Sequence, residues 1–149
     1  MPRGGNNGGN NGGGNGGNRG GLSGSNRDDQ LVGTGADEFI FGNRGDDTID
    51  AGGGSDTVTG GRGADVFVVT PDSDRIVITD FEDGIDRIDV SGFGFDVNDI
   101  NGGQYVGYLA DANGDTYLQF FDTTSGDMVA EVVLQDFSYT LIDPGDYIL

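Results

Sequence analysis

Four acidic residues recur at intervals of nine, and they are the side chains in this sequence best placed to do chemistry. They are Glu38, Asp47, Asp56 and Asp65. An apolar residue follows each of them two positions later, and glycine gathers at the positions before each of them. Carboxylates that a repeat brings close together repel one another, and a hard cation with oxygen ligands removes this repulsion. The spacing therefore indicates a series of metal-binding carboxylates.

The elements that must position these acids are four nine-residue phrases, at 33–41, 42–50, 51–59 and 60–68. Glycine at positions one, two and four tolerates positive φ, so each phrase predicts a tight turn followed by about three strand residues. The acid is at position six, and the apolar residue at position eight points inward. Successive turns should lie on opposite sides of a flattened coil. Stacking would then bring Glu38 near Asp56, and Asp47 near Asp65.

The ligand types available in such turns favour calcium. Calcium accepts six to eight oxygen ligands at irregular angles, whereas magnesium demands a tighter octahedron and retains its water. The chain has no His and no Cys, and its only soft ligands are two Met, which disfavours zinc, copper and iron–sulfur clusters. Each phrase buries only one apolar residue, and the free energy of that burial is too small to offset the conformational entropy lost when the backbone of the phrase is ordered. We therefore expect the repeat to need calcium in order to fold.

Composition excludes several other classes of function. Acidic residues outnumber basic ones by 26 to 7, all seven basic residues are Arg, and the net charge is −19. Such a charge argues against binding to nucleic acid or to anionic membrane surfaces. Without His or Cys there can be no HExxH zinc protease, Ser-His-Asp hydrolase, Cys-His protease or disulfide framework. No apolar run approaches the roughly 18 residues of a membrane span, and the N-terminus lacks the apolar core of a cleaved signal peptide.

The chain divides into three predicted parts of an all-β protein. Residues 1–30 are rich in Gly and Asn and predict a disordered tail. Residues 31–77 hold the repeats, including a degenerate closing phrase at 69–77 that would place Asp74 at position six and Ile76 at position eight. Residues 78–149 predict a β-rich cap with strands at 104–110, 116–121 and 128–134.

Three further features each leave two interpretations open. Asp80, Asp83, Asp86 and Asp89 form a second acidic cluster, which is either an extra calcium site or the polar face of capping strands and turns. Residues 111–115 contain an Asn-Gly pair typical of a hairpin, but they also resemble part of an EF-hand loop. Four Arg residues either balance charge or line a ligand groove. They are Arg44, Arg62, Arg75 and Arg87.

The phrase resembles the Gly-Gly-x-Gly-x-Asp-x-apolar-x repeat of repeats-in-toxin (RTX) proteins, which form calcium-binding parallel β-rolls. The segments at 64–69, 78–81 and 86–93 are similar to the C-terminal cap of these modules, as found in serralysin-like proteases and in the R-modules of mannuronan C5-epimerases. The resemblance covers about residues 31–149. It implies a parallel β-roll capped by an antiparallel β region.

The resemblance also implies a ligand set of position-six carboxylates and of carbonyl oxygens at positions two and four, with about two or three calcium ions. The carboxylates are Glu38, Asp47, Asp56 and Asp65, with Asp74 in the degenerate phrase. The carbonyls belong to Asn43, Gly45, Gly52, Gly54, Gly61 and Gly63. Thr34 and Ala36 replace two glycines of the first phrase, and Glu38 replaces Asp. That phrase is therefore expected either to form a weak site or to act only as a cap.

Three functions are compatible with these expectations. The first is a non-catalytic bacterial calcium-binding module that is secreted to the cell exterior and folds there. The RTX resemblance implies export by a type I system with an uncleaved C-terminal signal, for which residues 146–149 are the candidate. The second is a calcium-dependent module that binds an acidic polysaccharide such as alginate. The third is the detached C-terminal domain of a secreted enzyme.

Overall fold

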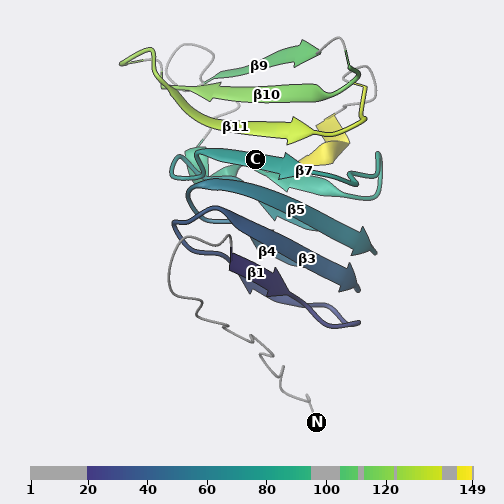
Figure 1. Cartoon of the computed structure of the whole chain (residues 1–149). Helices are drawn as coiled ribbons and strands as arrows, with labels where there is room; N and C mark the ends of the chain where they lie inside the picture. Colours follow the sequence, from purple (N-terminus) through teal and green to yellow (C-terminus); the bar gives the residue numbers. More distant parts are fainter. Residues whose placement is uncertain (1–19, 95–104, 111–112, 123, 139–143, 149) are drawn as a thin grey trace.

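The computed structural model describes residues 20–94, 105–110, 113–122, 124–138 and 144–148, with side chains left out of the description for 105–110 and 144. Two β-sheets form most of this structure (Figure 1). The seven strands of the larger sheet, in spatial order, are β1 (Gly20–Ser23), β3 (Glu38–Arg44), β5 (Ser55–Arg62), β7 (Arg75–Ile78), β11 (Met128–Leu134), β10 (Thr116–Phe121) and β9 (Tyr105–Ala110). The five strands of the smaller sheet are β12 (Tyr147–Ile148), β8 (Arg87–Asp89), β6 (Val66–Val68), β4 (Thr48–Asp50) and β2 (Gln30–Val32). Two short 3-10 helices, Ser91–Phe93 and Pro144–Asp146, accompany the sheets, and no helix of the described residues is long and apolar enough to cross a membrane.

The chain alternates between the two sheets and so winds a parallel β-roll, as the repeat predicts. Phe39 pairs with Thr57 in the larger sheet, 18 residues later and therefore two phrases on. Thr48 pairs with Val66 in the smaller sheet at the same spacing. All pairings among β1, β3, β5 and β7, and among β2, β4, β6 and β8, are parallel. Turns one and three consequently stack on one side and turns two and four on the other.

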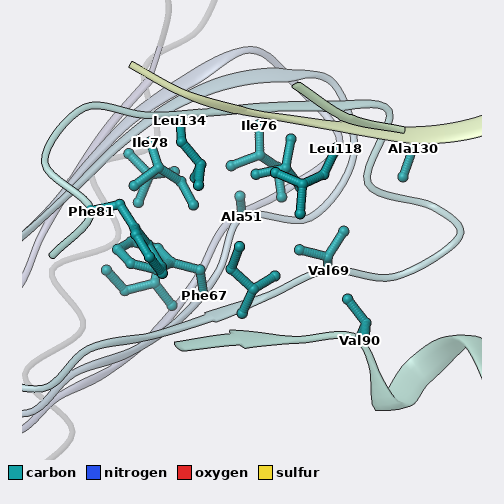
Figure 2. Packing of buried hydrophobic residues seen from close by; sticks show 14 of the residues in the cluster. Ala51, Phe67, Val69, Ile76, Ile78, Phe81, Val90, Leu118, Ala130 and Leu134 are labelled. Atoms are coloured by element: carbon teal, nitrogen blue, oxygen red, sulfur yellow. The ribbon is translucent and has the colours of Figure 1, made fainter. Parts of the chain in front are cut away.

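Apolar residues from position eight form a column in the interior of the roll, and Ala51, Val69, Ile76 and Val90 are buried in the same cluster. Figure 2 shows how this column continues into the cap through Leu134 and Leu118. Phe81 connects the two parts, because its ring lies 6.2 Å from that of Phe67 and 5.3 Å edge-on from that of Phe137. The members of the column within the roll are Leu31, Ile40, Ile49, Val58, Phe67, Ile78 and Ile88, all buried.

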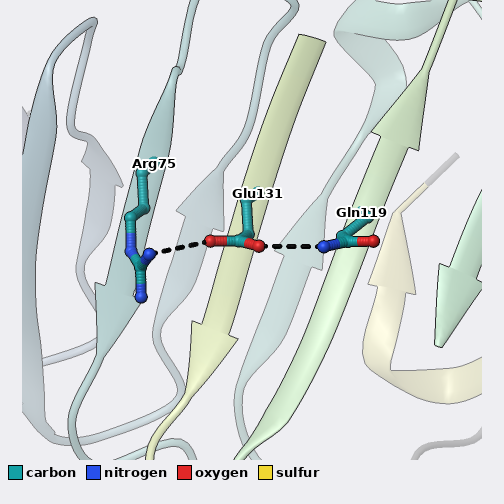
Figure 3. Close-up of polar contacts among 3 residues, drawn as sticks. All are labelled: Arg75, Gln119 and Glu131. Carbon is teal, nitrogen blue, oxygen red and sulfur yellow. Dashed lines mark hydrogen bonds and ion pairs between the residues drawn. The ribbon is translucent and has the colours of Figure 1, made fainter. Parts of the chain in front are cut away.

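The cap continues the larger sheet and reverses its strand direction. β11 pairs in parallel with β7, and β10 and β9 then add in antiparallel fashion, so the predicted antiparallel region is confirmed. β9 and β10 flank residues 111–115, which confirms the predicted hairpin there, and no helix flanks this turn as an EF-hand would require. Where roll meets cap, Arg75 on β7 forms an ion pair of 3.1 Å with Glu131 on β11, which also accepts a hydrogen bond from Gln119 on β10 (Figure 3). Arg75 thus balances charge.

The roll begins earlier than the sequence indicates. The composition predicts a disordered tail over residues 1–30, of which 1–19 lie outside the described part and 20–30 belong to the folded structure. In the structure, β1 pairs with β3, and the Gly24 amide donates to the Phe41 carbonyl at 2.8 Å. Leu22 packs against the core and Leu31 is buried, so these two apolar side chains compensate for ordering a segment that is otherwise rich in glycine and polar residues.

The predicted register of the closing phrase at 69–77 is wrong. Asp56 pairs with Ile76 and Val58 with Ile78, so the offset is 20 residues rather than 18. The two extra residues lie in a turn around Pro71, closed by a hydrogen bond from the Ser73 amide to the Thr70 carbonyl. Ile76 and Ile78 therefore occupy positions six and eight, and Asp74 moves out of the line of acids.

Candidate metal centre

The acids at position six form hydrogen-bonded ladders along both sides of the roll. On one side, the amide of Asp29 donates to Oδ1 of Asp47 at 2.8 Å, and the amide of Asp47 donates to Oδ1 of Asp65 at 2.9 Å. The amide of Asp65 donates in turn to Oδ1 of Asp86 at 3.0 Å. On the other side, the amide of Glu38 donates to Oδ1 of Asp56 at 2.9 Å. Each turn thus fixes one carboxylate oxygen of the next turn on the same side.

Three of these carboxylates have a second oxygen with no protein partner. Oδ2 of Asp47, Asp56 and Asp65 is buried and accepts no hydrogen bond, and each of these residues is only 1% exposed. A buried carboxylate oxygen without a partner is costly, and a bound cation is one of the few ways to compensate for that cost. The three unpartnered oxygens are therefore the strongest indication of where a cation would be held.

Glycine leaves the space next to these oxygens open. A Cβ atom added to Gly42 would collide with both Oδ2 of Asp47 and the carbonyl oxygen of Gly60. These two oxygens, from two stacked turns, consequently face the same small space. A Cβ atom at Gly60 would likewise meet Oδ2 of Asp65. In these two turns, glycine at position one keeps the space free for a ligand, whereas Ala51 occupies position one of the turn that carries Asp56.

The six residues with predicted carbonyl ligands share a left-handed backbone. Their φ angles are 81° at Asn43, 115° at Gly45, 80° at Gly52, 97° at Gly54, 108° at Gly61 and 132° at Gly63. Glycine adopts positive φ freely, and Asn is among the few other residues that do so readily. The glycine pattern of the sequence is therefore a requirement of the turn conformation at positions two and four.

Burial also changes the acidity of these carboxyl groups. Desolvation raises the pKa of Asp47 and of Asp56 from 3.8 to about 6, and neighbouring acids add to the increase. Desolvation raises the pKa of Asp65 as well. In each case a backbone hydrogen bond opposes the increase without cancelling it. Such groups resist ionisation when alone, and a divalent cation beside them would hold them ionised.

The donor set fits calcium. Among the residues that the structure describes, no three acidic side chains converge on one point. A cation between stacked turns would therefore be held by one or two carboxylates together with carbonyl oxygens. Calcium accepts such mixed oxygen ligands at irregular angles.

Two residues of the predicted ligand set differ from the others. Glu38 is nearly buried, at 9% exposed, but both of its carboxylate oxygens already accept hydrogen bonds from Thr34. Asp74 is exposed, and its Oδ2 accepts a hydrogen bond of 3.2 Å from the Gly54 amide. The two-residue insertion before Asp74 places it at position four of its turn, outside the ladder.

Sequence reasoning missed two members of the ladder, Asp29 and Asp86. The signal for Asp29 was present, because residues 24–32 continue the nine-residue frame with Asp29 at position six and Leu31 at position eight. Asp86 follows Asp65 by 21 residues, so a three-residue insertion conceals it. Burial raises its pKa to about 6, although both of its oxygens accept backbone hydrogen bonds.

The acidic cluster around Asp86 is largely engaged with the backbone of the turns. The Asp80 carboxylate accepts hydrogen bonds from the amides of Gly60 at 2.9 Å and Gly61 at 2.8 Å. Oδ1 of Asp89 accepts one from the Ser91 amide at 2.9 Å. These contacts favour the interpretation of the cluster as the polar face of capping turns.

Comparison with known proteins agrees with this geometry. The family model of the RTX calcium-binding nonapeptide repeat matches residues 32–67 in four copies. The solution structure of the AlgE6R3 subunit from the Azotobacter vinelandii mannuronan C5-epimerase matches with 30% identity and a TM-score of 0.57, over 84% of this chain and 80% of that one. This chain is a member of the RTX family. It carries an RTX β-roll, whose nonapeptide repeats bind calcium.

Two other solved structures resemble this RTX protein. The AlgE6R2 subunit of the same epimerase is 32% identical over 85% of this chain and 91% of that chain, with a TM-score of 0.42. The extracellular lipase LipA from Serratia marcescens is 21% identical over 87% of this chain but only 20% of the lipase, with a TM-score of 0.48. A comparison with curated proteins found no match.

Proposed function

We propose that this RTX module is a non-catalytic secreted protein whose folding is coupled to extracellular calcium. The observation that carries the proposal is the set of three buried, unpartnered oxygens on Asp47, Asp56 and Asp65. Without a cation these oxygens oppose folding, and with one they favour it. Because no preformed site exists in an unfolded chain, the free energy of calcium binding becomes free energy of folding.

The proposed ligands follow from the same geometry. Asp47, Asp56 and Asp65 supply carboxylate oxygens, and the residues with positive φ at positions two and four supply carbonyl oxygens. The carbonyl donors are Asn43, Gly45, Gly52, Gly54, Gly61 and Gly63. About two or three calcium ions would suffice for this set. When bound, calcium supplies charge neutralisation and crosslinks stacked turns.

Coupling to calcium provides a physical basis for export by a type I secretion system. At low calcium inside the cell, a net charge of −19 keeps the chain expanded and able to pass a narrow channel. Calcium outside the bacterium then drives folding. The candidate C-terminal signal includes Tyr147 and Ile148, which form β12 beside β8 in the folded protein. Folding of the roll would therefore engage part of that signal in the smaller sheet.

A calcium titration by calorimetry tests the proposal. The Asp47→Ala, Asp65→Ala double variant should bind about one ion fewer and lose much of its calcium-dependent β structure. The matched control is Asp72→Ala, Asp83→Ala, which removes the same charge from two exposed positions and should behave like the wild type. Unchanged stoichiometry in the first variant would contradict the assignment of the ladder.

A second candidate function is calcium-dependent binding of an acidic polysaccharide such as alginate. Arg44 and Arg62, both at position three, are direct cross-strand neighbours on β3 and β5 and are exposed. Like charges in this arrangement destabilise a sheet unless an anion lies between them, and neither Arg has an ion pair with the described residues. The likeness to a module of a mannuronan C5-epimerase supports the same ligand class.

Retention on calcium alginate beads tests this second candidate. Arg62→Ala should reduce retention at low salt, and Arg87→Ala, which removes an exposed Arg from the other sheet, should not. Retention that survives Arg62→Ala would exclude a specific Arg44–Arg62 site.

A further inference from the structure

The stacked turns fall into two chemical classes, distinguished by what satisfies the acid at position six. In turns 24–29 and 33–38, the acid is hydrogen-bonded by the residue at position two of its own turn. Oδ2 of Asp29 accepts from the Ser25 amide at 2.6 Å and from Ser25 Oγ at 2.8 Å. Oε2 of Glu38 accepts from the Thr34 amide, and Oε1 from Thr34 Oγ1, both at 2.7 Å.

The later turns lack this internal donor pair. In turns 42–47, 51–56 and 60–65, position two is Asn43, Gly52 or Gly61, none of which has a hydroxyl group. The Gly52 amide donates instead to Oδ1 of Asp50 at 3.1 Å, and the Gly61 amide to Oδ2 of Asp80 at 2.8 Å. The acids of these three turns are the ones that keep a buried oxygen without a partner.

Backbone conformation separates the same two classes independently. Positions two and four have positive φ in all three later turns. The corresponding residues of the first two turns do not, and these are Ser25, Arg27, Thr34 and Ala36. Because φ sets the direction of the neighbouring peptide groups, the carbonyls of the first two turns are not arranged like those of the later ones.

From these two observations we infer that turns 24–29 and 33–38 are closed by Ser25 and Thr34 without a cation, and that calcium is held only where Asp47, Asp56 and Asp65 keep an unpartnered oxygen. The inference rests on the proposed function and specifies it further. It removes Glu38 from the ligand set and leaves Asp47, Asp56 and Asp65 as the carboxylate ligands. Ser25 and Thr34 become the residues that decide which turns do not bind.

This arrangement gives the roll a metal-independent N-terminal end. Among the described residues, no complete turn precedes turns 24–29 and 33–38 on their own sides of the roll, so a cation bound there would find described ligands on one side only. A hydroxyl and an amide from the same turn satisfy the acid locally and do not need an earlier turn. The inference therefore explains why the departures from the glycine pattern are concentrated at the start of the roll.

A matched pair of isosteric variants tests the inference in the full chain. Glu38→Gln and Asp56→Asn each remove one negative charge, on adjacent turns of the same ladder. In a calorimetric titration with calcium chloride, Glu38→Gln should keep the wild-type number of ions and a midpoint within about twofold. Asp56→Asn should bind about one ion fewer. Circular dichroism at saturating calcium verifies that both variants fold.

A gain of binding tests the role of position two directly. The Thr34→Gly, Ala36→Gly, Glu38→Asp variant gives turn 33–38 the residue types of the later turns. It should bind about one ion more than the wild type, and an unchanged ion count would overturn the role of Thr34.

The outcomes distinguish the inference from the function on which it rests. Loss of an ion in both Glu38→Gln and Asp56→Asn overturns the inference and leaves calcium-coupled folding intact. No loss in either variant contradicts Asp56 as a ligand and overturns the inference, whereas the proposed function itself is contradicted by a folded spectrum of the wild-type protein in excess chelator.

Discussion

Acidification should stabilise the fold of the calcium-free protein. Its usual effect is the opposite, because it protonates carboxylates that form ion pairs or hydrogen bonds in the folded state. The groups responsible are Asp47, Asp56 and Asp86. Each has a pKa raised from 3.8 to about 6 in the folded state, chiefly by burial. A raised pKa means that the folded protein binds these protons more tightly than the unfolded chain does.

The sign and the magnitude follow from this difference in proton affinity. The stabilisation is fully present below the unfolded pKa of 3.8 and is lost as the pH rises through about 6. Each pKa unit corresponds to about 1.4 kcal/mol, so lowering the pH from about 7.5 to about 4.5 should add about 2 kcal/mol per carboxylate. Asp47 and Asp86 both couple to Asp65, so the three contributions should sum to less than about 6 kcal/mol.

Far-ultraviolet circular dichroism of metal-stripped protein at several pH values measures the folded fraction, and urea denaturation at each pH where the protein is folded measures its stability. Metal-stripped protein is preferable to a chelator, whose own affinity for calcium falls in acid. One variant replaces the three buried acids, as Asp47→Asn, Asp56→Asn and Asp86→Asn. The control replaces three exposed acids, as Asp72→Asn, Asp83→Asn and Asp127→Asn. The two variants carry the same net charge, so the loss of three negative charges reduces charge repulsion within the protein equally in both.

The buried variant should lose most of the stabilisation by acid, and the exposed control should keep it. Our reasoning is refuted if the metal-free wild-type protein becomes less stable between neutral pH and about pH 4.5. It is also refuted if both variants lose the pH dependence equally, because burial would then not be its cause.

Three further predictions concern the roll as a whole. Gly42→Ala should destabilise the calcium-bound protein by about 1–3 kcal/mol and weaken calcium binding, because the new Cβ would collide with Asp47 and Gly60. The control Gly21→Ala adds a Cβ in open space and should have neither effect. Phe67→Ala should cost about 3–5 kcal/mol in urea denaturation at saturating calcium, since Phe67 is fully buried in the apolar core. Chelation of calcium at neutral pH should abolish most of the β signal in circular dichroism, and a folded spectrum in excess chelator would contradict calcium-coupled folding.

The repeat made the roll predictable because its period acts at two levels. Glycine at fixed positions determines the turns locally, and the apolar residue at position eight determines which face is buried. The observed pairings, such as Phe39 with Thr57, follow from this period alone. The cap strands were also close to prediction, with the strand expected at 104–110 observed at Tyr105–Ala110.

The sequence frame failed wherever residues are inserted between turns. Two extra residues around Pro71 moved Asp74 out of the ladder, and three before Asp86 hid a member of it. A turn can accommodate insertions at little cost because it lies at the surface, whereas the strands cannot change register without exposing their buried face. Only the paired strands show where the extra residues go.

The sequence by itself determined the parallel β-roll, its calcium-binding class and the spacing of its acids, because these depend on residue type and period. The tertiary structure decided which acids are ready to bind. Asp47, Asp56 and Asp65 keep a buried oxygen without a partner, whereas Thr34 satisfies Glu38. Thr34 reaches Glu38 within its own turn, but the burial that leaves the three Asp oxygens without a partner comes from the stacking of turns that are distant in the sequence, which no local pattern of residues specifies.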